Sequence, residues 1–96
     1  MSELAAFQDE SIVSRVLLKT PGGSVTAFAF AKGDGLQEHS TPHEALFVVT
    51  DGEADVRIAG ETQRVRAGES LRLPASVPHA VHAPVDVRVL LVMLRS

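Results

Sequence analysis

Histidine is the residue type through which this chain has the clearest capacity for chemistry, and its four copies fall into two short segments. The first segment, Glu38 to Gly52 (EHSTPHEALFVVTDG), contains His39 and His43. The second, Gly68 to Ala83 (GESLRLPASVPHAVHA), contains the other two, of which His79 comes first. Imidazole is a common metal ligand and exchanges protons near neutral pH. The sequence therefore predicts a functional site if the fold brings the two segments together.

The first segment offers several candidate ligands. His43 lies four residues after His39, which places both side chains on the same face of a continuous strand. Pro42 interrupts backbone pairing there, so His43 or the adjacent Glu44 can turn inward. A set of His39, His43 and His79, completed by Glu44 or water, would suit a divalent metal ion. Glu44 is also the best candidate for a catalytic proton transfer, followed by a histidine that binds no metal.

Simpler interpretations of the same residues remain open. His39 and His79 could line a pocket as hydrogen-bonded histidines without metal, and His43 and Glu44 could be solvated loop residues. His82 lies three positions after His79 and therefore falls on the opposite face of a strand. We expect it on the surface or at an interface.

The hydrophobic pattern around these segments has the period of β-strands. Segment 24–32 (SVTAFAFAK) alternates between two faces, as a strand does. Gly52, Gly60 and Gly68 stand eight residues apart and separate two more alternating segments, ADVRIA and TQRVRA. Short strands joined by tight glycine turns predict an antiparallel meander. No segment predicts a helix of two or more turns, so the expected fold is an all-β sandwich or barrel.

The C-terminal segment 86–94 (DVRVLLVML) is apolar on both faces from Val89 onward. A strand with one solvated face has no need of this pattern, so the second face is expected to meet another layer or another subunit. Several arginines alternate outward and are expected to form a solvated face paired with acidic residues. They are Arg57, Arg64, Arg66 and Arg72.

The composition limits the function classes. Ninety-six residues allow one domain, which we place at 11–96 after a polar N-terminal arm at 1–10. A net charge of −3, no basic stripe and no Trp or Tyr argue against a nucleic-acid partner. No apolar segment reaches the length of a membrane span, and no signal-peptide pattern is present, so neither membrane association nor export is expected. The expected location is cytoplasmic.

Both histidine segments resemble motifs of the cupin superfamily, the small double-stranded β-helix or jelly-roll barrels built from antiparallel strands. The resemblance covers roughly residues 24–94. Matching positions are Gly33, His39 and Gly52 in the first motif and Gly68, Pro74 and His79 in the second. The resemblance implies a metal site of three histidines and one glutamate inside the barrel, suited to Fe, Mn, Ni or Zn, and it favours homodimers.

The chain departs from this family pattern at several positions. Thr41 stands where the family has its second histidine, and Ala45 stands where it has the glutamate. In the second motif Ser76 replaces a glycine and Ala83 replaces an asparagine. Only His39 and His79 therefore remain of the implied ligand set, with His43 and Glu44 as substitutes. Thr41 and Ala45, together with Phe47, which lies on the inner face by counting in twos from His39, are expected to line the pocket.

Three functions are consistent with these residues. The first is a small cupin that binds a divalent metal ion and catalyses dioxygenase- or isomerase-type chemistry on a small molecule. The second is a non-catalytic module that binds or senses a small molecule with a degenerate metal site. The third is a barrel that serves assembly alone. In each case we expect a homodimer, and in the first two a small-molecule ligand.

Overall fold

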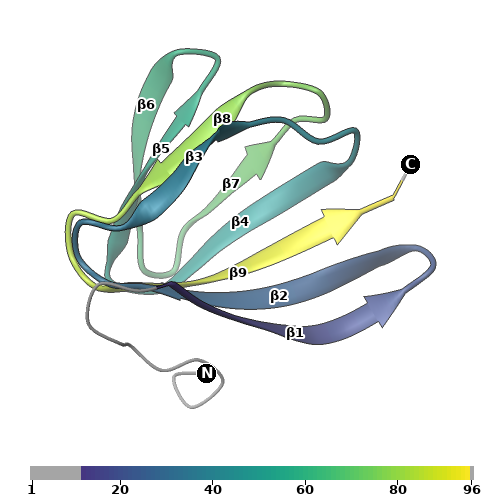
Figure 1. The fold of residues 1–96 in the computed structure, drawn as a ribbon, viewed down its shortest axis with the longest axis horizontal. Helices are drawn as coiled ribbons and strands as arrows, with labels where there is room; N and C mark the ends of the chain where they lie inside the picture. The colour runs from purple at the N-terminus through teal and green to yellow at the C-terminus, as the bar shows by residue number, and fades with distance from the viewer. Residues whose placement is uncertain (1–11, 96) are drawn as a thin grey trace.

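The structure, a computed structural model, describes residues 12–95, and the predicted arm at 1–10 lies outside the described residues. Within 12–95 the chain forms nine β-strands and no helix. The strands make two antiparallel sheets that face each other (Figure 1). The predicted all-β jelly-roll barrel is thereby confirmed. In this part of the chain no helix is long and apolar enough to cross a membrane.

The larger sheet has five strands, and the C-terminal strand lies at its centre. In spatial order they are β1 (Ile12–Thr20), β2 (Gly23–Phe30), β9 (Val87–Leu94), β4 (Glu44–Asp51) and β7 (Ser70–Leu73). Strand β9 pairs with β2 on one side and with β4 on the other. Residues from the first third of the chain and from its last ten are therefore hydrogen-bonded neighbours.

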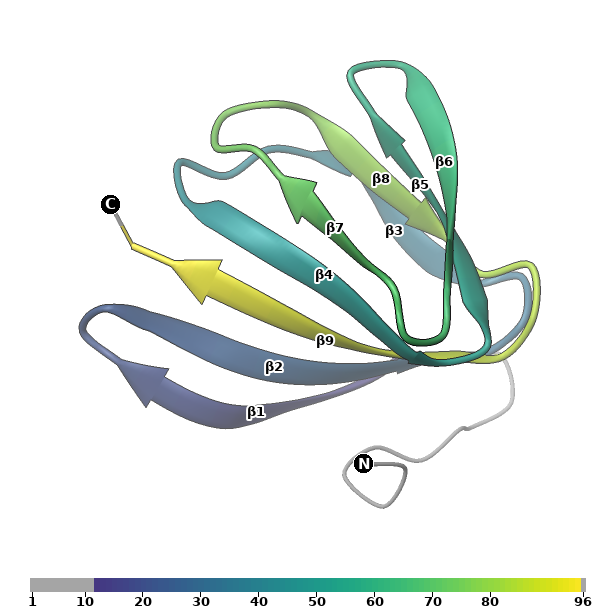
Figure 2. The same cartoon turned by 180° about the vertical axis from the view of Figure 1, so that it is seen from behind.

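The smaller sheet has four strands. In spatial order they are β3 (Gly35–His39), β8 (His79–His82), β5 (Glu53–Ile58) and β6 (Glu61–Arg66). Both views show this sheet tilted over the larger one (Figures 1 and 2). The β3–β4 and β7–β8 connections lie at the same end of the barrel, and we call this end the rim.

The predicted meander through Gly52, Gly60 and Gly68 is wrong. Only the Gly60 turn joins two paired neighbours, β5 and β6, whereas the Gly52 and Gly68 turns carry the chain from one sheet to the other. An alternating pattern shows which face of a strand is buried. The same pattern arises whether the neighbouring strand is near or far in the sequence. The pattern therefore predicted the strands but not their partners.

The core lies between the two sheets and consists of the inward side of each alternating strand. Phe30, Val56 and Val87 have no exposed surface, and Phe47 is 2 % exposed. Removing one such side chain from water contributes roughly 1.5–3 kcal/mol. A continuous cluster of these residues fills the barrel and fixes the positions of the strands at the rim.

The outer face of the larger sheet is also apolar. Leu90 on β9 packs with Ala27 and Ala29 of β2, which are 3 % and 1 % exposed. Leu46 and Leu94 continue this face toward the rim and remain 40 % and 57 % exposed. Packing within the sheet thus explains part of the two-sided hydrophobicity of segment 86–94. The rest of its outer face forms an exposed apolar surface.

Candidate functional site

His39 and His79 lie forty residues apart in the sequence but come together at the rim. His39 is the last residue of β3 and His79 is the first of β8, and the two are directly paired in the antiparallel ladder. Their ring centroids are 4.4 Å apart, and the ring planes meet at 67°. The two histidine segments of the sequence therefore do meet, through one residue from each.

Each of these rings is held by a backbone carbonyl two residues earlier in its own strand or loop. His39 Nδ1 lies 2.9 Å from the Gln37 carbonyl, and His79 Nδ1 lies 3.3 Å from the Val77 carbonyl. A carbonyl oxygen only accepts hydrogen bonds, so Nδ1 carries the proton in both rings. In the neutral imidazole, Nε2 is then left as an acceptor or ligand atom, the arrangement found where histidine binds a metal.

The two rings differ in their exposure to water. His39 is exposed, whereas His79 is 5 % exposed. Burial lowers the pKa of His79; the bond to the Val77 carbonyl opposes this shift in part, and the nearby His39 adds to it. His79 is therefore a neutral imidazole at neutral pH, with a lone pair on Nε2.

Beneath the two rings lies a small cavity with an otherwise apolar lining. Its volume is about 20 Å³, enough for one water molecule or one ion. Phe28 and Phe30, whose rings stack with centroids 5.7 Å apart, form part of the wall. The other apolar lining residues are Leu36, Phe47, Leu73, Val81 and Leu91. The imidazoles are the polar groups of this lining, so they decide what binds here.

Of the other residues predicted for this site, Phe47 lies in the wall of the cavity, whereas Thr41, His43 and Ala45 lie outside it. The Thr41 hydroxyl accepts a hydrogen bond from the His43 amide at 2.9 Å, and the Thr41 carbonyl accepts one from the Ser76 amide at 2.7 Å. Ala45 is buried in the core. His43 Nδ1 is buried and has no hydrogen-bond partner. Among the residues that the structure describes, no three histidines or carboxylates gather closely enough to hold a metal ion.

Glu44 lies on the opposite face of β4 from the cavity. The burial pattern of β4 puts Ala45 inside and Leu46 outside, and Glu44 shares the side of Leu46. One carboxylate oxygen accepts hydrogen bonds from Arg72, and the other accepts the Ala75 amide at 2.7 Å. The bond from Arg72, followed by that from Ala75, lowers the pKa of Glu44. The carboxylate is therefore ionised at neutral pH, and its proposed role in proton transfer stays a prediction.

Sequence reasoning missed two features of the rim. The first is the contact of Glu44 with Arg72 and Ala75, about thirty residues away, because nothing local in sequence indicates it. The second is the positive φ of Ser76, 63°. This second feature had a signal, since Ser76 stands where the family motif has glycine, the residue that adopts such angles most readily.

The metal site implied by the family resemblance is only partly matched. Two Nε2 atoms, one on the buried ring of His79 and one on the exposed ring of His39, are suitable ligands, and the cavity has the size of an ion. Catalytic zinc sites, for comparison, use three protein ligands and one open position. The described residues supply two at one place, so we derive no catalytic step through a metal.

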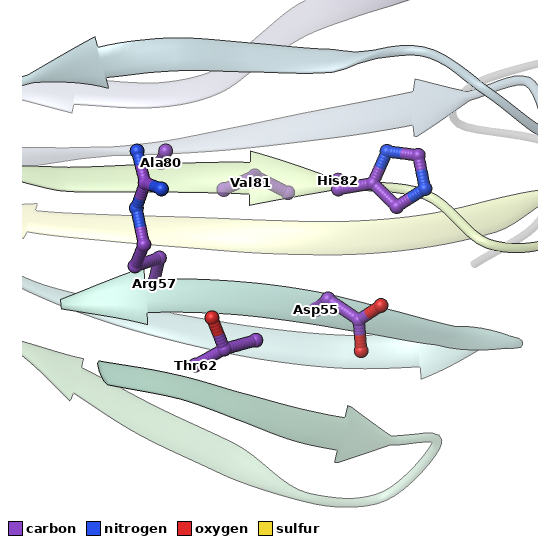
Figure 3. Close-up of a pocket in the computed structure, with 6 residues that line it drawn as sticks. All are labelled: Asp55, Arg57, Thr62, Ala80, Val81 and His82. Carbon is purple, nitrogen blue, oxygen red and sulfur yellow. The ribbon is translucent and has the colours of Figure 1, made fainter. Parts of the chain in front are cut away.

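A separate groove lies on the outer face of the smaller sheet. Its volume is about 260 Å³, and its lining is Asp55, Arg57, Thr62, Ala80, Val81 and His82 (Figure 3). Arg57 lies 3.6 Å from Glu38, and Asp55 is paired with Arg64, so most of its charges have partners. His82 belongs to this solvated face and is not part of the histidine pair.

Comparisons with known proteins agree on the fold. A family model described as "Cupin domain" matches residues 27–94. A cupin 2 conserved barrel domain protein from Leptotrichia buccalis shares 35 % identity over 99 % of this chain, with a TM-score of 0.95, and this chain spans 46 % of that protein. A conserved protein of unknown function from Streptococcus pyogenes shares 31 % identity, with a TM-score of 0.88, over 93 % of this chain and 78 % of the other.

More distant structures support the fold alone. A cupin superfamily protein from Desulfitobacterium hafniense is 20 % identical, with a TM-score of 0.93, over 98 % of this chain and 86 % of the other. A search of curated proteins finds no match.

Proposed function

This chain belongs to the cupin family, which confirms the resemblance, and on this basis we propose that its barrel binds a small molecule through His39 and His79. The observation that carries the proposal is the orientation of the two imidazoles. Both Nδ1 atoms are bound to carbonyls, which leaves both Nε2 atoms free beside an apolar cavity. A few well-placed polar groups on an apolar wall are typical of ligand sites.

The charge of the lining indicates an uncharged ligand. The cavity wall contains no Lys, Arg, Asp or Glu among its nine residues, and the lowered pKa of His79 keeps that ring neutral. A neutral Nε2 accepts a hydrogen bond, so a hydroxyl group that donates one is the matching partner. An anion would find no positive charge at this place, and its desolvation would not be offset.

The size of the cavity limits how much of the ligand enters. About 20 Å³ holds a hydroxyl group or a water molecule. The rest of the ligand must therefore lie at the mouth, beside the exposed ring of His39. We propose a mainly apolar molecule with one hydroxyl group, bound at the rim without being turned over.

A titration with three aromatic probes of similar size tests this proposal. Phenol, toluene and benzoate are added to the protein at pH 7.5 while the ring signals of the histidines are followed by NMR. We expect phenol to shift the His39 and His79 signals in a saturable way, and toluene and benzoate to bind on the order of tenfold more weakly because neither donates a hydrogen bond.

Two variants complete the test. His79→Phe should abolish the phenol response, whereas His82→Ala, on the outer face, should leave it unchanged. Preferential binding of benzoate, or no response of either ring to phenol, would rule the proposal out.

The second candidate is a divalent-metal cupin with oxygenase or isomerase activity, as the sequence first suggested. It is favoured by the same free Nε2 atoms and by the size of the cavity. Elemental analysis of untagged protein, and calorimetry with Zn²⁺, Mn²⁺ and Ni²⁺, distinguish it from the first. Stoichiometric metal that is lost in His39→Ala would support it, and unchanged binding in His43→Ala would exclude His43 as the third ligand.

We further propose that the protein acts as a homodimer. The partner would be a second copy that covers the outer face of the larger sheet, where Leu46 and Leu94 remain exposed beside Leu90. Apolar faces of this kind mark interaction surfaces. A cytoplasmic location stays a prediction from the sequence.

A further inference from the structure

The loop from Pro74 to Pro78 determines how His79 is oriented. This loop joins β7 to β8 and ends directly before His79. Its Val77 carbonyl accepts the Nδ1 hydrogen bond that holds the His79 ring. A change in the loop backbone would therefore move the acceptor and release the ring.

One residue of the loop has a backbone conformation that is unfavourable on its own. Ser76 has φ 63°, in the left-handed region, which is unfavourable for a residue with a side chain. Such residues persist where surrounding contacts fix them. Within the loop the Val77 amide donates to the Pro74 carbonyl at 3.4 Å, a long bond, so shorter bonds from outside the loop are needed to fix it.

Besides the Ala59 amide of the β5–β6 turn, which donates to the Pro78 carbonyl at 3.0 Å, two hydrogen bonds fix the loop to the adjacent β3–β4 connection and to the start of β4. The Ser76 amide donates to the Thr41 carbonyl at 2.7 Å. The Ala75 amide donates to the Glu44 carboxylate at 2.7 Å, and this bond is partly buried. Of the acceptors in these last two bonds, only the Glu44 carboxylate belongs to a side chain. A point mutation can therefore remove this bond and not the other.

Arg72 holds the other side of the same carboxylate. Its Nε and Nη2 both lie 2.6 Å from Glu44 Oε1. The Arg72 side chain is 70 % exposed, and exposed ion pairs contribute little to stability. The arginine therefore orients the carboxylate, and the Ala75 bond transmits that orientation to the loop.

We propose that Glu44 is a positioning residue, which ties the β7–β8 loop to β4 so that the Val77 carbonyl keeps His79 against His39. Glu44 acts from the outer face, through the backbone, without contact with the cavity. The inference concerns the geometry of the histidine pair and holds whichever ligand the pair binds.

Conservative variants separate this role from an acid–base role. Glu44→Gln keeps the length of the side chain and an oxygen for the Ala75 amide but removes the charge; it is made together with Arg72→Gln, so that its NH2 group faces an acceptor and not the two arginine donors. Glu44→Asp keeps the charge but is one methylene too short to reach the amide. If Glu44 positions His79, Gln should preserve the histidine pair and Asp should not. If Glu44 acted only as an acid or base, both variants would preserve the histidine pair.

NMR measures the outcome directly. The readouts are the nuclear Overhauser contacts between the His39 and His79 rings and the exchange rate of the Ala75 amide. In Glu44→Asp and Glu44→Ala we expect loss of the ring contacts and amide exchange faster by on the order of tenfold, as for loss of one hydrogen bond to a charged group. In Glu44→Gln both should stay near the parent.

Arg64→Ala is the matched control, since it removes an exposed arginine bound to Asp55 and Glu53 on the other sheet. It should change neither readout. If Glu44→Ala does not fold, the Gln and Asp variants still decide. Parent-like ring contacts in Glu44→Asp, or their loss in Glu44→Gln, would overturn the inference.

Discussion

At the scale of single residues, His79 differs from the other three histidines because its ring is buried. Its neighbours keep it neutral and fix which nitrogen carries the proton. The chemistry of the rim therefore depends on one ring that water hardly reaches and on a second, His39, that water does reach. This asymmetry gives the pair an inner acceptor and an outer one.

The lowered pKa of His79 predicts a loss of stability in acid. Below the ordinary imidazole value of about 6.5 the unfolded chain binds a proton that the folded chain takes up only at lower pH. The contribution of His79 to stability is therefore complete above about pH 6.5 and is lost as pH falls from there toward the lowered folded value. Urea unfolding at pH 7.5 and 5.5 should show a larger drop for the parent than for His79→Gln.

The matched variant for this comparison is His82→Gln, on the exposed outer face. It should keep the parental loss of stability between the two pH values. Equal losses in the parent and in His79→Gln would contradict the assignment to His79.

Ser76 predicts a stabilising substitution. Because Ser76 has φ 63°, Ser76→Gly should raise the free energy of unfolding by about 1 kcal/mol. Ser40→Gly, in the neighbouring loop at a φ that is not positive, should lower it slightly, since glycine there only adds freedom to the unfolded chain. Denaturant titration measures both, and a destabilised Ser76→Gly variant would refute the assignment of strain.

At the scale of strands, the histidine pair depends on the ladder between β3 and β8. Gly35 opens β3, and a Cβ there would lie 2.0 Å from the Val81 carbonyl of β8. The two strands can approach each other this closely only because glycine has no side chain. The ladder that ends in the His39–His79 pair therefore begins with this close approach, and its register shifts once between Leu36 and His39.

Gly35→Ala should therefore separate β3 from β8 and cost about 1–3 kcal/mol of stability, as overpacking does. The ring contacts between His39 and His79 should weaken with it. Gly22→Ala is the control, because its nearest neighbour would be the Thr20 hydroxyl at 3.8 Å, an ordinary contact. Circular dichroism melts and the NMR ring contacts test both variants, and a Gly35→Ala protein like the parent would show that β3 can shift without cost.

Much of the strand content followed from the sequence, since alternation over segment 24–32 and around Gly60 predicted β2 and the β5–β6 hairpin. Motif spacing predicted that His39 and His79 belong to one site. Strand partners were not predictable, because β2 pairs with β9, some sixty residues away. The link from Glu44 to Ala75 was hidden for the same reason: it depends on tertiary neighbours and leaves no local pattern.

At the scale of the whole molecule, the apolar outer face of the larger sheet predicts self-association. Leu46→Arg should shift the protein toward the monomer in sedimentation experiments at micromolar concentration, because a charge would be buried in the interface. Val85→Arg is a close control: Val85 is 41 % exposed and Leu46 40 %, but Val85 lies in the β8–β9 loop. A parent that sediments as a monomer would contradict the homodimer.

The central place of β9 also has a consequence for biosynthesis. Strands β2 and β4 leave the ribosome long before β9, yet each has β9 as a neighbour in the finished sheet. Until β9 emerges, their unpaired backbone edges and apolar side chains are exposed to other nascent chains. The barrel therefore cannot close before residues 87–94 have been translated, and chaperones that shield strands are expected to bind this protein during that interval.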